Sequence, residues 1–151
     1  MRLNMKSSLL SQSKFYHPAL NSAIFDGPFR IYFAKPQEVL ALKIYFKIQE
    51  AVEESLQETK NLFKVLQHSL YIMLYPNEQS LSESFDIHRE SGKIPMEILD
   101  HEFVLGLNGE VTEDSEIDLL IRKIQIIVND WKIIASEVSI QNRPKDDLAS
   151  L

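Results

Sequence analysis

The chain has 151 residues, a formal net charge of −6 at pH 7 and no cysteine. This length suits one domain with a core of its own, and the missing cysteine excludes disulfides, thiolate metal sites and cysteine nucleophiles. The acidic balance argues against a nucleic-acid binder, which needs clustered Lys and Arg. Because no stretch approaches the ~20 apolar residues that span a membrane or forms a signal-peptide core, we expect a cytoplasmic protein with no membrane contact.

Residues 1–27 are mixed in character, with several serines and Pro18, and a Gly27-Pro28 pair follows at their end. We expect an irregular N-terminal arm, because glycine and proline interrupt helices and strands. Its apolar residues are too many for a solvated tail, so part of the arm should lie on the domain. One place for it is over Leu119, Ile126 and Ile133.

Residues 29–33 alternate and are rich in aromatic and β-branched types, which predicts a strand with Phe29, Ile31 and Phe33 facing the core. Pro36 suits a first helical turn, and the pattern from 37 to about 67 is helical. The polar run 53–61 dilutes its apolar arc, so this helix bends there, projects beyond the sheet or splits in two.

Residues 70–75 form a continuous apolar run that ends at Pro76, which predicts a strand buried on both faces and a β-α-β unit with 29–33. The polar stretch from 76 to 93 is expected to be loop, with a hairpin turn at 90–93. Residues 96–99 and 103–107 are short strand candidates.

The strongest pattern runs from 111 to 140 and predicts a helix that begins near 113. Acidic residues occupy its first turn, where they interact well with the helix dipole. Apolar residues recur at the spacing of one helix face. The core-facing residues are Ile117, Leu120, Ile121, Ile124, Ile127, Val128, Trp131, Ile134 and Val138.

A second apolar line, Leu119, Ile126 and Ile133, recurs every seven residues on the opposite side of this helix. It needs a covering element of its own. Three arrangements fit: the line packs under the N-terminal arm or beside the first helix, it binds a partner helix or a second copy of the protein, or the helix ends near Trp131 and a final strand follows.

These elements predict an α+β fold, a small mixed sheet of three to five strands with two long helices packed on it, in a ferredoxin-like or related sandwich. We expect residues 28–140 to form this single domain. Residues 141–151 should be a flexible tail.

The four glycines are too scattered for a phosphate loop, and we expect no cofactor. Asp86, His88 and Glu90 would share one face of a strand, and the stretch 100–102, with His101, could join them as ligands for a divalent metal. The alternative is a solvated hairpin edge whose charges prevent strand pairing.

Because the helices carry surplus apolar surface and no catalytic motif occurs, the sequence favours a non-catalytic interaction protein, an adaptor, regulator or chaperone-like module. Its partner-binding residues would be Leu119, Ile126 and Ile133, and self-association would cover them. The alternative function is a small metal-dependent hydrolase that uses the cluster at 86–102. Binding of a small apolar ligand between sheet and helix is a third possibility.

Overall fold

The computed structural model describes residues 14–55, 57, 60, 61, 64, 68–85, 94–99, 102–110 and 113–141. These residues form a five-stranded mixed sheet in the order β1-β2-β3-β5-β4. The strands are β1 (Ser22–Asp26), β2 (Phe29–Phe33), β3 (Ser69–Tyr75), β4 (Met96–Leu99) and β5 (Glu102–Asn108). The expected α+β class with a mixed sheet is therefore confirmed.

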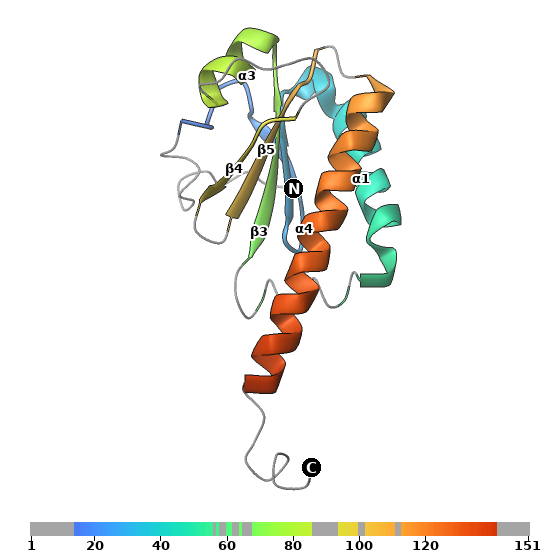
Figure 1. The fold of residues 1–151 in the computed structure, drawn as a ribbon. Coiled ribbons are helices and arrows are strands. Elements are labelled where there is room, and N and C mark those ends of the chain that lie inside the picture. The colour runs from blue at the N-terminus through green and yellow to red at the C-terminus, as the bar shows by residue number, and fades with distance from the viewer. Residues whose placement is uncertain are drawn as a thin grey trace, which may run out of the picture.

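Helices cover both faces of this sheet. Figure 1 shows α1 (Glu38–Ala51) and α4 (Asp114–Gln141) on one face and the short helix α3 (Glu78–Phe85) on the other. Among the described residues the element order is β-β-α-β-α-β-β-α, which differs from the β-α-β-β-α-β order of ferredoxin-like domains. The fold is thus a related sandwich.

The centre of the sheet is parallel and its edges are antiparallel. β2 pairs with β3 and β3 with β5 in parallel, whereas β1 and β4 pair antiparallel with β2 and β5. All seven residues of β3 are buried, as expected for a central strand covered on both faces. The predicted β-α-β unit, strand 29–33 followed by a helix and strand 70–75, is confirmed as parallel.

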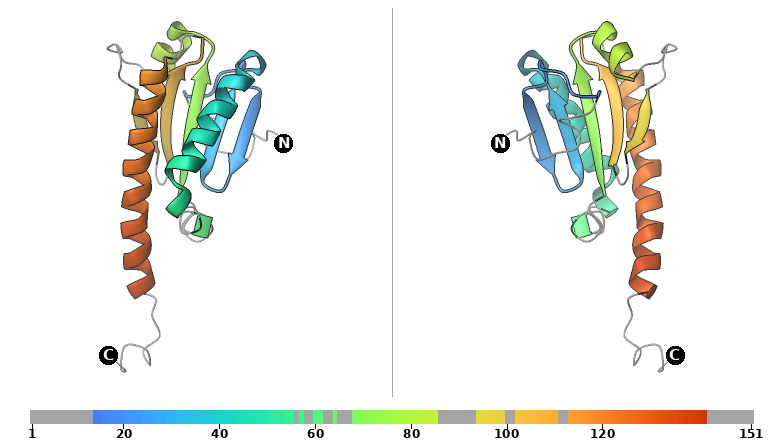
Figure 2. Two further views of the ribbon diagram at one scale, coloured as in Figure 1. Left: turned by 90° about the vertical axis from the view of Figure 1, so that its right-hand side faces the viewer. Right: turned by 90° about the vertical axis from the view of Figure 1, so that its left-hand side faces the viewer.

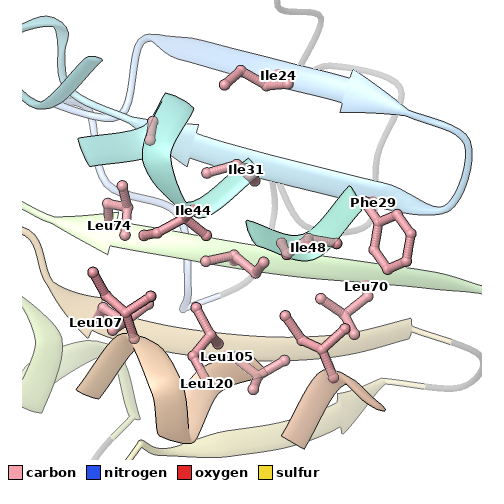
Figure 3. Packing of buried hydrophobic residues seen from close by; sticks show 14 of the residues in the cluster. Ile24, Phe29, Ile31, Ile44, Ile48, Leu70, Leu74, Leu105, Leu107 and Leu120 are labelled. Atoms are coloured by element: carbon pink, nitrogen blue, oxygen red, sulfur yellow. The ribbon is translucent and has the colours of Figure 1, made fainter. Parts of the chain in front are cut away.

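The alternation of β2 separates two apolar clusters. Phe29, Ile31 and Phe33 face α1 and α4, where they join the larger cluster, shown in part in Figure 3. Tyr32 points to the opposite face, into a smaller cluster with Leu81 and Phe85 of α3. Both faces of the sheet are therefore packed.

The prediction of an irregular arm up to residue 27 is wrong for its last part, because residues 22–26 form β1. Asp26 pairs with Phe29 across a two-residue turn, and Gly27 has a φ of 58°. Glycine with positive φ at the first turn position is what a type II′ hairpin requires. The Gly-Pro pair therefore marks a hairpin turn within the sheet and not the end of an arm.

The segment before β1 does lie on the domain, but not over α4. Phe15 and Leu20 are buried in the smaller cluster, and the Tyr75 hydroxyl donates a 2.7 Å hydrogen bond to the Phe15 carbonyl. This cluster is on the face opposite to α4. Residues 14–27 therefore do not cover Leu119, Ile126 and Ile133.

The long helix expected over 37–67 is interrupted. Pro36 lies in a 3₁₀ turn, η3 (Lys35–Gln37), that leads into α1, in agreement with its predicted place in the first turn. α1 ends at Ala51, Val52 has the non-helical ψ of 13°, and a second 3₁₀ turn, η4 (Glu53–Ser55), follows. The break coincides with the start of the polar run at 53, where an apolar arc no longer holds the helix on the sheet.

The loop expected over 76–93 contains a helix, α3. The Asn77 side chain accepts hydrogen bonds from the Ser80 amide at 2.8 Å and from its hydroxyl at 2.7 Å, which caps the helix. Leu81 and Phe85, four residues apart, are both buried. Gly106 of β5 admits them, because a Cβ there would lie 2.4 Å from Phe85 and 2.6 Å from Leu81. The expected turn at 90–93 lies outside the described residues.

α4 begins one residue after the predicted start and continues to Gln141, so a final strand after Trp131 is excluded. Trp131 packs against the rings of Phe29, His68 and Phe103, which lie at or next to the first residues of β2, β3 and β5. The ten residues after Trp131 extend the helix by about 15 Å. Figures 1 and 2 show this end projecting beyond the sheet.

Candidate interaction surface

The inner side of α4 matches the predicted stripe. Ile117, Leu120, Ile124, Val128 and Trp131 are at most 3% exposed. They contact the larger cluster under the helix, so the 3.6-residue periodicity identified the core side correctly. The Trp131 Nε1 is buried, and no acceptor for it is found among the described residues.

The outer side carries the second apolar line, which the structure divides into two parts. Ile126 is 64% exposed and Ile133 is 53% exposed. Leu119 is partly buried and packs against the larger cluster. Two of the three predicted partner-binding residues thus face away from the core.

The first helix does not cover this line either. The grooves between α1 and α4 are lined by residues from a different side of α4, including Asp118, Ile121, Gln125 and Val128. The larger groove, about 400 Å³, is open and is lined by both basic and acidic side chains. Among the described residues, therefore, neither the N-terminal segment nor α1 shields Ile126 and Ile133.

The outer side of α1 repeats the pattern. Val39 is 81%, Leu42 39% and Phe46 60% exposed. They lie on the side of α1 opposite to its buried residues Ala41, Ile44 and Ile48. In the described part of the chain this side is uncovered, so both helices of this layer present apolar residues to solvent.

The charges of this layer are mixed. Lys43 of α1 donates a 2.8 Å hydrogen bond to Asp114 at the start of α4, and this contact lowers the pKa of the Asp114 carboxyl. On α4 itself, Arg122 and Lys123 lie between Leu119 and Ile126, and Asp130 lies between Ile126 and Ile133. The apolar line is therefore flanked by basic groups on one half and an acidic group on the other.

Sequence reasoning missed two exposed apolar residues on the edge strand β4. Met96 is 40% and Ile98 59% exposed. They pair with Leu105 and Phe103 of β5, whose side chains lie on the face covered by α1 and α4. Their alternation with Glu97 is the signal that could have placed them on this face.

The predicted metal ligands Asp86, His88, Glu90 and His101 lie outside the described residues, so the cluster stays a prediction. Within the part of the chain that is described, no three His, Asp or Glu side chains come close enough to hold a metal. Glu102, next to His101, accepts a 3.0 Å hydrogen bond from the Tyr71 hydroxyl.

Two histidines and two tyrosines in the described part of the chain make structural contacts. His17 Nδ1 accepts a 3.1 Å hydrogen bond from the Ala19 amide, and His68 packs against Trp131. Burial raises the pKa of Tyr32 to about 12 and also raises that of Tyr75. Hydroxyls held neutral in this way do not supply a base near pH 7.

In the described residues no helix has both the length and the apolar character needed to cross a membrane. Comparisons of the chain with protein families, with curated proteins and with solved structures find no match.

Proposed function

We propose that this protein is a non-catalytic interaction module of the cytoplasm, an adaptor, regulator or chaperone-like protein, that binds through the outer side of α4. Ile126 lies at the centre of the contact, with Leu119 and Ile133 at its two ends. A second copy of the chain is the proposed partner.

The observation that carries the proposal is the exposure of Ile126 and Ile133 on a helix whose opposite side is already buried in the core. A helix at the surface of a monomer needs one apolar side only. Fully burying an isoleucine stabilises by about 1.5–3 kcal/mol, so two of them on one helix provide a driving force for association.

The acidic composition and the absence of cysteine support a protein that acts by contact and not by thiol chemistry or nucleic-acid binding. The groove between α1 and α4, about 400 Å³, is open, and its Lys47, Glu50, Asp118 and Arg122 place opposite charges within it. Ligand sites are usually enclosed and mostly apolar, so this groove gives no support to the enzyme alternative.

The test compares Ile126→Asp and Ile133→Asp with Ile98→Asp. Ile98 is the control, because it is similarly exposed, at 59%, but lies on the edge strand β4 and not on α4. Sedimentation velocity at several protein concentrations measures the mass, and circular dichroism checks the fold.

We expect the unmodified chain and Ile98→Asp to associate as the concentration rises, and the two α4 variants to remain monomeric and folded. A monomeric unmodified chain at every concentration would refute self-association. Unfolding of the α4 variants would show instead that these side chains belong to the core.

A further inference from the structure

The charges along the outer side of α4 are arranged antisymmetrically about Ile126. Arg122 and Lys123 lie between the first and second apolar residues, and Asn129 and Asp130 lie between the second and third. Lys123 and Asp130 are each flanked at three and four residues by leucine or isoleucine only, so neither has an ionic partner at these spacings within its own helix. Among the described residues neither side chain is found in a salt bridge, so both charges can pair with a second copy.

From this we infer that the partner is a second copy whose α4 lies antiparallel on the first, related by a twofold axis at Ile126. The inference rests on the proposed function and adds the orientation and register of the contact. In this arrangement Ile126 meets Ile126 of the second copy, Leu119 meets Ile133, and Lys123 approaches Asp130.

A parallel pair in the same register is disfavoured. It would place the basic Arg122 and Lys123 of the two copies at one level and both Asp130 side chains at another, and like charges at one level oppose association. The antiparallel pair instead joins opposite charges at both ends of the apolar contact. An isologous contact of this kind also closes after two copies and does not propagate into a filament.

The same twofold rotation brings the outer side of α1 in the second copy near the end of α4 in the first. Lys47 of α1 and Asp118 of α4 line one groove, so they lie at the same level of the helix layer. Asp118 lies eight residues before Ile126, and Ile134 lies eight residues after it. The second copy's α1 thus passes beside the end of α4 at about Ile134, and the exposed Phe46, next to Lys47, reaches that end.

The contact is short. Leu119 and Ile133 are 14 residues apart, which is about 21 Å of helix. Stable protein interfaces bury about 800 Å² on each partner, more than three apolar side chains supply alone. We therefore expect a reversible dimer whose population depends on concentration.

Single cysteines test the orientation, because the natural chain has none. Packed helix axes are 8–10 Å apart, which brings facing Cα atoms within the ~7 Å limit for a disulfide. Under mild oxidation we expect Ile126→Cys to link to itself. Leu119→Cys and Ile133→Cys should not link to themselves, since equal positions are about 21 Å apart, but should link to each other when mixed.

A charge exchange and a substitution in α1, both made in the chain without cysteine, provide independent tests through the dissociation constant of the dimer. Lys123→Glu should raise the dissociation constant of the dimer about three- to tenfold, and the double variant Lys123→Glu/Asp130→Lys should restore it. Phe46→Asp should weaken the dimer. Val39→Asp is its matched control, because the same rotation places Val39 past the end of α4.

The outcomes separate this inference from the proposed function. Self-linking of Leu119→Cys and of Ile133→Cys, without mixed linking, would overturn the antiparallel arrangement and leave self-association through α4 intact. A dimer that is lost in Ile126→Asp but links at none of the three cysteines would overturn it as well. A chain that is monomeric at all concentrations and links nowhere would refute both.

Discussion

Gly106 determines how closely α3 approaches the sheet, and its replacement by alanine should loosen that contact. A methyl group at this position would lie 2.4 Å from Phe85 Cε2 and 2.6 Å from Leu81 Cδ1. Carbon atoms in contact are ordinarily about 3.5–4.0 Å apart, so α3 or the two side chains must move.

The magnitude follows from two opposing effects. Overpacking a core costs about 1–3 kcal/mol, whereas replacing glycine within a strand recovers about 0.5–1 kcal/mol of backbone entropy. At the central values of these ranges, Gly106→Ala loses about 1 kcal/mol in the free energy of unfolding. For a chain of 151 residues this lowers Tm by about 2–4 °C.

Urea and thermal unfolding, followed by circular dichroism, measure this loss. The fluorescence of Trp131, the single tryptophan, reports at the same time on the opposite face. Gly109→Ala is the control: its Cβ would lie 2.5 Å from Gln37 Nε2, at the end of a side chain that can rotate away, so its loss should be smaller.

A double-mutant cycle with Phe85→Leu tests the cause. If the methyl group collides with the Phe85 ring, Phe85→Leu should be less destabilising in the Gly106→Ala background than in the natural chain. Additive losses, or a Gly106→Ala variant as stable as the natural protein, would show that Gly106 does not control the packing of α3.

Two further predictions concern pH and metal. Because burial raises the pKa of Tyr32 from 10.0 to about 12, its neutral form stabilises the fold fully below pH 10, and about 2–3 kcal/mol is lost as the pH rises from 10 to 12. Urea unfolding at pH 8 and pH 11.5 should show a smaller fall for Tyr32→Phe than for the natural chain, and equal falls would contradict this. For the metal-dependent alternative, calorimetric titration with zinc, manganese or magnesium should give no binding heat under the interaction proposal. Heat that disappears in His88→Ala would revive the hydrolase hypothesis.

The central elements could be predicted from sequence because their patterns are long or unmixed. The apolar run 70–75 is too short for a buried helix, so its length favours a buried strand. In residues 113–138 the apolar positions recur often enough to define one face of a helix. Both elements also lie at the centre of the fold, where tertiary packing agrees with local preference.

Two short elements, α3 and β1, were missed from the sequence, because contacts in the folded protein determine them more than local sequence does. α3 has eight residues and only two large apolar side chains, Leu81 and Phe85, and its main local signal is the Asn77 cap. β1 precedes a Gly-Pro turn that also suits the end of an arm. The deciding factor is tertiary packing in both cases: α3 packs on Gly106, which is distant in sequence, and β1 pairs with β2 at the edge of the sheet.

The candidate surface was predictable in position but not in environment. Helical periodicity placed Leu119, Ile126 and Ile133 on one line opposite the core stripe. It could not show that Leu119 lies partly against the core while Ile126 and Ile133 face solvent. That difference depends on where the neighbouring chain segments run: Phe15 and Leu20 lie in the cluster on the other face of the sheet, and residues 22–26 form its edge strand β1.

The free end of α4 has a consequence for amide hydrogen exchange. Among the described residues, no strand lies beneath the ten or so residues of α4 beyond Trp131 (Figure 1), and a helix of that length is marginal in water without tertiary support. In an isolated copy the backbone amides there should exchange with solvent far faster than those over the sheet. Any molecule that binds to the outer side of α4 would slow this exchange. Deuterium uptake in this one segment therefore reports binding, whichever molecule is bound.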